Sequence, residues 1–84
     1  MGKWQRLNLG STFTHPPVDV WAVLRLVPKT GLHTDIRYDI GYLQPDSRTG
    51  RKLWWHGTRG CEDPAKMKRD HDIWWCLVPP FNAV

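Results

Sequence analysis

Two pairs of adjacent tryptophans, Trp54-Trp55 and Trp74-Trp75, constrain the fold of this 84-residue chain more than any other feature. Neighbouring side chains in a β-strand point to opposite faces of the sheet, so each pair places one indole on the core face and one on the other face. A short chain has a thin core, which a few large side chains fill. Core positions are therefore expected for Trp4, Trp21, Trp55 and Trp75, and positions on the opposite, partner-facing surface for Trp54 and Trp74.

Apolar residues alternate with polar ones over two long segments, which is the pattern of half-buried strands. In residues 18–27, the core face is expected to carry Val18, Val20, Ala22, Leu24 and Leu26. Trp21 falls on the reverse face, where we expect a second cluster covered by residues 11–17. After a turn at residues 28–31 the alternation resumes from Thr34, and the inward side chains are expected to be Ile36, Tyr38, Ile40 and Tyr42. The two segments predict an antiparallel hairpin.

Turn residues divide the rest of the chain into shorter elements. A turn at residues 45–50 leads to a strand over 52–56, which the segment 57–60 ends, and further strands are expected over 3–9 and 72–78. Asp63-Pro64 has the form of a helix N-cap followed by a proline in the first turn, and it predicts a helix of about seven residues. The expected fold is mainly β and a single domain: a small antiparallel sheet or open barrel of about five strands, with one short helix before the last strand.

The charge of the chain is moderately positive, with 12 Lys and Arg against 8 Asp and Glu and a formal net charge of +4. Such an excess attracts anions in general. Acidic residues lie among the basic ones between Arg48 and Arg69, and such a mixture is more often an ordinary solvated surface than a phosphate-binding stripe. No apolar run follows the first basic residues, so we expect an intracellular protein, and residues 73–78 are too short an apolar stretch to span a membrane.

Four potential zinc ligands form two pairs with the same spacing: His56, Cys61, His71 and Cys76. A set of two cysteines and two histidines suits tetrahedral zinc, which would contribute directly to the folding of so small a domain. The two-residue gap between cysteines that is typical of structural zinc sites is missing. The alternative is a pair of buried cysteines that act as small hydrophobes and a pair of surface histidines, with no cofactor.

Motifs of catalysis are weak in this sequence. The two serines, Ser11 and Ser47, fall in turn-like segments rather than in a nucleophile elbow, and the segment 57–60 lacks the length and the Lys-Ser/Thr of a phosphate-binding loop. Cys61 beside His56 or His71 is the remaining thiol–imidazole candidate. We expect a protein that is not an enzyme.

Two binding hypotheses remain. In the first, the chain binds another protein through Trp54, Trp74, Tyr42, Arg51 and Arg59, because aromatic and arginine side chains dominate the hot spots of protein interfaces. Adjacent antiparallel strands would then set the two indoles side by side. In the second, exposed indoles stack on the bases of single-stranded nucleic acid and the phosphates are bound by Arg48, Arg51, Lys52 and Arg59. Ionic strength separates the two hypotheses, since nucleic-acid binding weakens steeply with salt.

Four segments resemble a family of small phage- and prophage-encoded proteins of unknown function: Trp4, the apolar strand 20–27, residues 36–39 and the closing run 75–79. Those proteins open with a tryptophan and end in a His-Trp-Met-Pro-Leu-Pro run, whereas here Trp74 stands in place of the histidine and Cys76 and Leu77 in place of methionine and proline. The resemblance implies a compact, mainly β viral accessory protein in the cytoplasm of a bacterial host, with no catalytic residues to transfer. By analogy, the partner is a host protein or complex that the protein inhibits, as anti-CRISPR and other anti-defence factors do.

Overall fold

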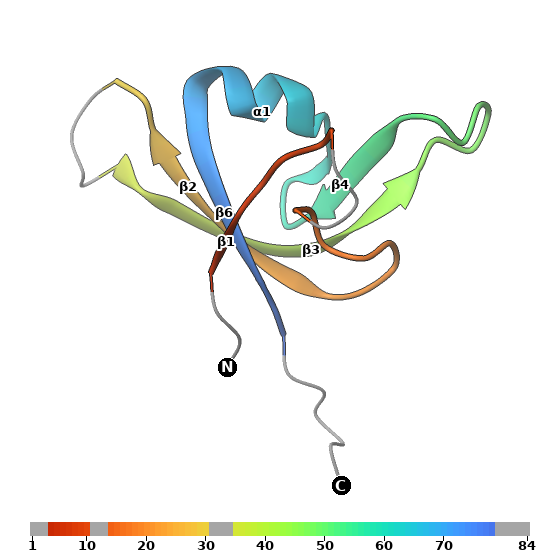
Figure 1. Cartoon of the computed structure of the whole chain (residues 1–84), viewed down its shortest axis with the longest axis horizontal. Coiled ribbons are helices and arrows are strands. Elements are labelled where there is room, and N and C mark those ends of the chain that lie inside the picture. The colour runs from red at the N-terminus through yellow and green to blue at the C-terminus, as the bar shows by residue number, and fades with distance from the viewer. Residues whose placement is uncertain (1–3, 11–13, 31–34, 79–84) are drawn as a thin grey trace, which may run out of the picture.

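Six strands and one short helix make up residues 4–10, 14–30 and 35–78, the parts of the chain that this computed structural model describes. The strands are β1 (Gln5–Arg6), β2 (Ala22–Pro28), β3 (Arg37–Pro45), β4 (Leu53–Gly57), β5 (Gly60–Glu62) and β6 (His71–Leu77), and the helix is α1 (Pro64–Asp70). All of the strand pairings are antiparallel, in the order β1-β6-β2-β3-β4-β5 (Figure 1). The mainly β fold with one short helix before the last strand is thus confirmed.

The connectivity places the last strand inside the sheet, between β1 and β2. Strands β2 to β5 form a meander in which each strand pairs with the next, and the chain then passes through α1 before β6 returns to pair with β2. The short strand β1 closes the far side of β6. Strand β3 sweeps across the whole molecule, so that the β3–β4 hairpin lies away from the half that β2 and β6 form (Figure 1). As a result, two strands separate β4 from β6.

Helix α1 begins and ends as its sequence predicts. The Asp63 carboxylate is the N-cap and accepts a 3.0 Å hydrogen bond from the amide of Ala65, while Pro64 occupies the first turn, where a missing N–H costs nothing. Seven residues are too few to be helical alone, and the helix is stabilised because Pro64 and Met67 are buried against the sheet. Within the described ranges, no helix is long and apolar enough to cross a membrane.

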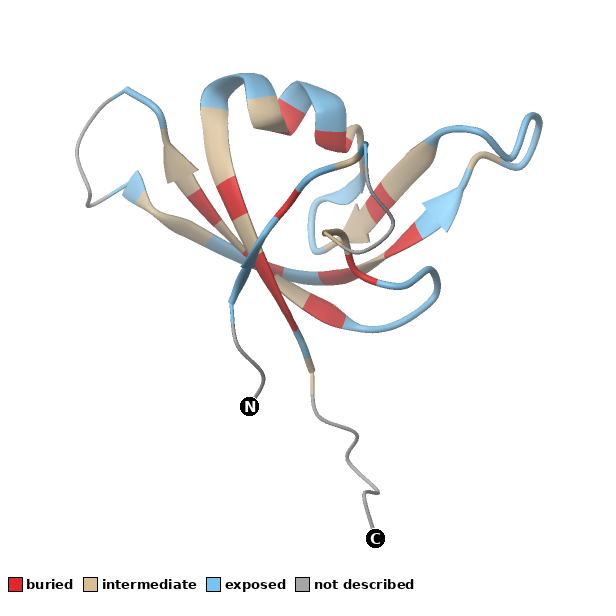
Figure 2. Ribbon diagram, in the orientation of Figure 1, coloured by how far each residue is buried: buried red, intermediate tan, exposed pale blue. Residues whose placement is uncertain are grey.

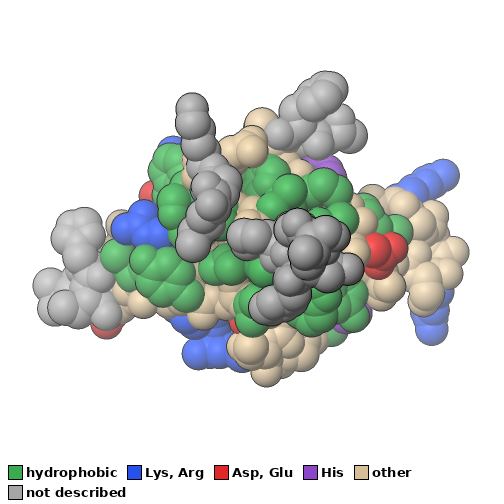
Figure 3. Space-filling view, turned by 90° about the horizontal axis from the view of Figure 1, so that it is seen from below, with side chains coloured by type: hydrophobic (Ala, Val, Ile, Leu, Met, Phe, Trp, Pro, Cys, Tyr) green, Lys and Arg blue, Asp and Glu red, His purple; other side chains and the backbone are tan. Residues whose placement is uncertain are grey.

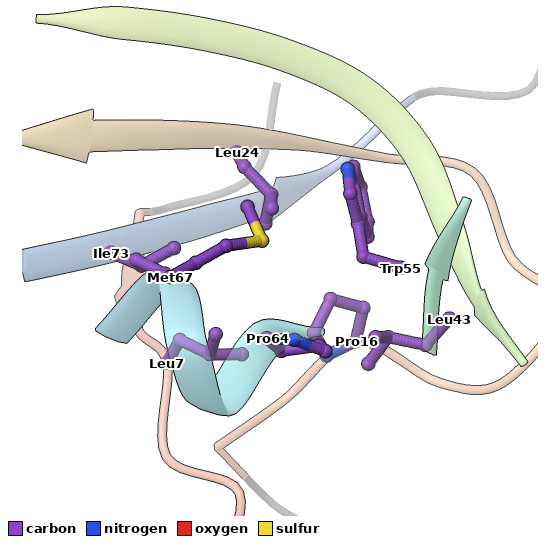
Figure 4. A pocket seen from close by; sticks show the side chains of 8 residues that line it. All are labelled: Leu7, Pro16, Leu24, Leu43, Trp55, Pro64, Met67 and Ile73. Carbon is purple, nitrogen blue, oxygen red and sulfur yellow. The ribbon is translucent and has the colours of Figure 1, made fainter. Parts of the chain in front are cut away.

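The core lies between α1 and one face of the sheet, and we call this the inner face. Its largest members, which are contributed by every layer of the fold, are Leu7, Leu24, Leu26, Leu43, Trp55, Met67, Ile73 and Trp75 (Figure 2). Figure 4 shows how Trp55 and Leu24 meet Met67 of α1, with Pro16 and Pro64 closing the far side. The space left among these side chains is about 10 Å³, which is no more than one water molecule needs. The space among these described core side chains is therefore too small for a ligand.

Strand β3 buries the opposite set of side chains from the set that its sequence predicts. Tyr38 is 60% exposed and Ile40 43% exposed, whereas Asp39 is 5% exposed and Leu43 is buried. The pairing explains the difference, because Asp39 lies opposite Leu24 of β2 on the inner face. The prediction that Ile36, Tyr38, Ile40 and Tyr42 point inward is therefore wrong. Burial of Asp39 is tolerated because every oxygen of its carboxylate accepts hydrogen bonds, as described below.

Two of the tryptophans expected in the core are largely exposed. Trp55 and Trp75 are buried as predicted, but Trp4 is 40% and Trp21 56% exposed, so for these two the prediction is wrong. The strand β2 begins only at Ala22, because Asp19 has a left-handed backbone (φ 63°) that interrupts the extended run. Val18 and Val20, before this strand, are exposed in consequence.

The remaining differences concern the ends of strands. The first strand is two residues long and does not extend over the predicted residues 3–9. The segment 57–60 does not end the sheet, because it turns the chain into an additional strand, β5, that the sequence did not predict. Gly60 supplies the left-handed backbone (φ 92°) of that turn. Lys3, residues 11–13, Gly31 and Thr34, which belong to predicted elements, lie outside the described residues.

Candidate partner-binding face

The face of the sheet opposite α1 carries most of the aromatic side chains that the core does not use. We call it the outer face and define it by Trp4, Arg6, Trp21, Val23, Arg25, Tyr38, Ile40, Tyr42, His56 and Trp74. The strand pairings place these residues on one side, because Val23 lies opposite Ile40, Arg25 opposite both Tyr38 and Trp74, and Tyr42 opposite His56. In the view from below, hydrophobic side chains gather over the middle of the molecule and basic ones lie more towards its margins (Figure 3).

The aromatic rings of the outer face contact one another in two groups. The ring of Trp4 lies 6.3 Å from that of Tyr38, between the ring centroids, in a tilted arrangement. In the second group, Trp21 meets Tyr42 edge to face (5.3 Å, 78°), and Tyr42 in turn stacks on His56 (5.2 Å, 11°). Edge-to-face and stacked rings at these distances attract one another, so their mutual contacts hold the side chains in place while leaving much of their surface in water.

Charge on the outer face is limited and partly neutralised. The guanidinium of Arg6 lies 5.7 Å from the centre of the Trp74 ring and donates a 2.7 Å hydrogen bond to the Asp72 carboxylate. Arg25 stands between Tyr38 and Trp74 in the register and, among the described residues, forms no ion pair. The face is therefore mainly apolar and aromatic, with an isolated guanidinium in it.

A shallow open pocket of about 380 Å³ lies at the end of the outer face that the β4–β5 hairpin forms. Its walls are the side chains of Trp21, Ile40, Tyr42, His56 and Cys61 and the turn residues Gly57, Thr58 and Gly60. None of these side chains carries a carboxylate, an ammonium or a guanidinium. The volume is at the lower end of the range for small-ligand sites, and its lining is the mixture of aromatic walls and few polar groups that such sites have.

The buried Asp39 carboxylate supports this pocket from the inner face. Its Oδ2 accepts a 2.8 Å hydrogen bond from the Trp55 indole, and its Oδ1 accepts bonds from the Thr58 hydroxyl (2.7 Å) and the Thr58 amide (3.1 Å). Burial raises the pKa of Asp39, but the hydrogen bonds from Trp55, Thr58 and the Ile40 amide outweigh it and hold the pKa below its ordinary value. Asp39 thus remains charged and fixes the turn that forms one wall of the pocket.

Two glycines make room for this arrangement. A Cβ at Gly57 would meet the Asp39 carboxylate and the Trp55 indole nitrogen, and a Cβ at Gly41 would meet the backbone of His56 and Gly57. The β3–β4 ladder brings these two glycines opposite each other, one residue beyond the pair that Tyr42 and His56 form. Glycine is needed at both positions because of close approach, not because of an unusual backbone.

The structure separates the residues that the sequence groups into one binding site. Trp74 and Tyr42 do belong to the outer face, but β4 and β6 are not neighbours, so the prediction that Trp54 and Trp74 lie side by side is wrong. Trp54 stands on the β3–β4 hairpin, where its indole nitrogen lies 3.5 Å from Asp46 Oδ2 and the Lys52 ammonium lies 4.5 Å from its ring centre. Arg51 precedes β4 at that hairpin, and Arg59 occupies the β4–β5 turn beside the pocket.

Sequence reasoning missed Trp21, Tyr38 and Ile40 as surface residues. It assigned Tyr38 and Ile40 to the core because they alternate with Arg37 and Asp39, and an aspartate is normally exposed. A signal against that choice was present, since Leu43 belongs to the same phase as Asp39 and Gly41.

The four candidate zinc ligands do not converge. His56 and Cys61 are cross-strand partners on β4 and β5, but the His71 ring lies against the carbonyl of Met67 (3.2 Å) and Cys76 is buried near the other end of β6. In the part of the chain that the structure describes, no three His, Cys, Asp or Glu side chains form a group suited to a metal ion. The alternative of two buried cysteines is also wrong for Cys61, which is exposed, and both thiols are free.

Comparisons of the chain with protein-family models, with curated proteins and with solved structures gave no match. The function therefore has to be inferred from the outer face itself. What this face offers chemically is a broad aromatic and aliphatic surface, a pocket whose described walls carry no charged side chain, and Arg59 in the turn next to that pocket.

Proposed function

We propose that this protein is a non-enzymatic binding module whose outer face attaches to another protein. The observation that carries the proposal is the exposure of Trp21 (56%) and Tyr38 (60%) together with the aliphatic Ile40 on one continuous sheet face. Contiguous exposed apolar surface of this kind marks interaction sites, because leaving it in water has a cost that a partner removes. Tryptophan, tyrosine and arginine, which dominate this face, are also the side chains that most often carry the binding energy of protein interfaces.

Single-stranded nucleic acid is the second candidate, and the distribution of cations speaks against it. Of the basic residues that the nucleic-acid hypothesis requires, Arg48 and Arg51 lie at the β3–β4 hairpin, and Lys52 is paired with Asp63 at 2.8 Å. On the outer face itself, Arg6 is paired with Asp72, which leaves Arg25 on this face and Arg59 beside the pocket as separate cations without an ion pair among the described residues. A surface that binds single strands combines free aromatic faces with a basic groove along them, and this face lacks the groove.

We further propose that the partner is a protein or protein complex of a bacterial host, and that binding inhibits it in the manner of an anti-CRISPR or other anti-defence factor. The resemblance to small phage and prophage proteins supports this part. A protein that acts by covering a surface needs no catalytic residues and no cofactor, which agrees with a site made of aromatic and aliphatic side chains. The site of action would then be the bacterial cytoplasm.

A capture experiment with matched variants tests the proposed function. Tagged wild type, Trp21→Ala, Tyr38→Ser and Arg69→Ala proteins are incubated with nuclease-treated bacterial lysate, and the captured proteins are quantified by mass spectrometry. Arg69 is an exposed residue of α1, on the opposite layer, and serves as the control. A protein that wild type and Arg69→Ala retain, and that both outer-face variants lose, supports the proposal. Equal capture by all four baits would refute it.

Salt and nuclease separate the two candidate functions in the same experiment. A protein partner held by buried aromatic side chains is retained when the salt concentration is raised from about 0.1 M to about 0.5 M, because screening acts mainly on exposed charges. Nucleic-acid binding weakens steeply over the same range. Capture that disappears with nuclease treatment or with added salt would favour the nucleic-acid function over the one proposed.

A further inference from the structure

We infer that the pocket between Trp21 and the β4–β5 hairpin is the anchor site of the interface: it takes one large apolar side chain from an extended segment of the protein partner, and that segment carries a carboxylate next to the anchoring side chain. The inference rests on the proposed function and gives the partner a chemical identity. It is carried by the shape of the pocket, by the way its walls are held and by the position of Arg59.

The shape of the pocket suits a single side chain. Trp21 and Tyr42 meet at 78°, so the two rings form a corner rather than a parallel slot, and Ile40 adds an aliphatic surface to it. The volume of about 380 Å³ is open to solvent on the outer face. Anchors of protein interfaces are apolar or aromatic side chains that enter pockets of this kind near the centre of the contact.

The walls of the pocket are held in place before any partner arrives. His56 stacks on Tyr42 within 11° of parallel, and the turn at Thr58 is tied to the buried Asp39 by bonds from both its amide and its hydroxyl. Gly57, between these two residues, is packed against Asp39 and Trp55. A preformed pocket retains more of the binding energy, because less side-chain and loop freedom is lost on association.

Charge near the pocket favours a carboxylate. Arg59 lies between Thr58 and Gly60, both of which line the pocket, and this exposed side chain takes part in no ion pair with any described residue. The chain as a whole has a net charge of +4, which attracts acidic partners. A carboxylate next to the anchoring side chain would pair with the guanidinium of Arg59, which belongs to the β4–β5 turn that lines the pocket.

An extended protein segment fits these features better than a nucleotide does. The mutual stacking of Tyr42 and His56 uses one face of each ring, and the remaining walls include Ile40 and glycine backbone, on which a base gains little. In addition, β5 is the last strand in the sheet order, so its outer side is open along the pocket among the described residues. Exposed strand edges of this kind bind extended segments by main-chain hydrogen bonds, while pockets select the side chains.

Selection from a displayed library of random peptides tests the inference with the intact protein. The baits are wild type, Trp21→Ala and Arg59→Glu, and thermal unfolding confirms that each is folded. Wild type is expected to enrich peptides in which an acidic residue lies within two positions of a large apolar residue, by about threefold or more over the unselected library, as an exposed ion pair allows. Arg59→Glu should shift the flanking preference from acidic to basic residues, and Trp21→Ala should lose the apolar anchor.

The outcomes that would overturn the inference differ from those that would overturn the proposed function. Enrichment that Trp21→Ala leaves unchanged, an absence of enrichment, or a flanking preference that Arg59→Glu does not alter would each refute the anchor site, even if lysate capture still depends on Trp21. So would NMR chemical-shift changes at the Trp21 indole and Thr58 amide that are larger with an oligothymidine than with the best selected peptide. Conversely, peptide binding in the pocket combined with lysate capture that ignores Trp21 and Tyr38 would refute the proposed function.

Discussion

The indole nitrogen of Trp55 donates a 2.8 Å hydrogen bond to the Asp39 carboxylate inside the core. This bond holds Asp39 on the side of β3 that faces α1. Because alternate side chains of a strand point to opposite faces, Tyr38 and Ile40 on either side of Asp39 must then lie on the outer face. The Trp55–Asp39 pair thus lies on the inner face with Leu43, and the side chains that flank Asp39 belong to the proposed binding face.

Replacement Asp39→Asn should destabilise the protein by about 1–3 kcal/mol at neutral pH. An asparagine has one acceptor oxygen, and its amide nitrogen would face a donor from either Trp55 or Thr58. Urea unfolding followed by tryptophan fluorescence measures the change. The control is Asp70→Asn, an exposed carboxylate at the end of α1, for which a change below about 0.5 kcal/mol is expected. Equal effects of the two replacements would show that the hydrogen bonds of Asp39 contribute nothing.

The stabilisation by Asp39 should disappear in acid. The pKa of Asp39 is lower in the folded protein than in the unfolded chain, because the hydrogen bonds from Trp55 and Thr58 outweigh the opposing effect of burial. A lowered pKa gives stability that is complete above the unfolded value, near pH 4, and that is lost as the pH falls through the folded value. The difference in unfolding free energy between wild type and Asp39→Asn should therefore stay constant from about pH 7 to about pH 5 and shrink as the pH falls further. A difference that grows towards low pH would contradict the assignment.

Gly57→Ala should be among the most damaging single changes on the hairpin. The added methyl group would overlap the Asp39 carboxylate and the Trp55 indole, both of which are fixed by their mutual hydrogen bond. A loss of about 1–3 kcal/mol is expected from the forced displacement. Gly10→Ala is the matched control, because among the described residues the nearest atom to its Cβ, Asn8 Oδ1, lies at 3.4 Å. If both alanine variants unfolded at the same urea concentration as wild type, the close packing described at Gly57 would be wrong.

Alanine replacements of Trp74 and Trp75 should lower the stability of the protein by very different amounts. Trp75 lies in the core with its indole donating to the Thr14 carbonyl at 3.0 Å, so Trp75→Ala should cost about 3–5 kcal/mol. Trp74 is only half-buried beneath Arg6, and the cost of Trp74→Ala should be below half of that. Thermal unfolding of the two variants gives the comparison. Similar melting temperatures of the two variants would contradict the assignment of Trp75 to the buried face of β6 and of Trp74 to the outer face.

Local sequence signals predicted the elements of this fold more accurately than their faces. Asp63-Pro64 predicted the start of α1, and the turn residues at 45–50 predicted the β3–β4 hairpin, because caps and turns depend on a few neighbouring residues. The inner face of β3 was predicted wrongly, since both phases of that strand carry apolar residues and the deciding partner, Trp55, is 16 residues away. A side-chain hydrogen bond between two strands leaves no periodic trace in the sequence of either strand.

The outer face could be predicted from the sequence only in part. Alternation placed Trp74 on the face opposite the buried Trp75, as the structure has it, but it placed Tyr42 on the inner face, which is wrong. Trp54 was grouped with Trp74 because β4 and β6 were taken as neighbours. The return of β6 to pair with β2 instead is a long-range choice, made by the packing of Trp75 and Ile73 in the core. The pocket at Trp21 depends on that same topology and on the short turn into β5, so local pattern alone does not predict it.

The affinity of the captured partner for outer-face variants tests the central claim most directly. Isothermal titration of that partner with wild type, Tyr38→Ser and Arg69→Ala compares an exposed side chain of the outer face with an exposed side chain of α1. Tyr38→Ser should weaken binding by about tenfold or more, about 1.4 kcal/mol, while its unfolding free energy stays within about 1 kcal/mol of wild type and Arg69→Ala binds as wild type does. Unchanged affinity for Tyr38→Ser together with a tenfold loss for Arg69→Ala would place the interface on the helix side and contradict the account.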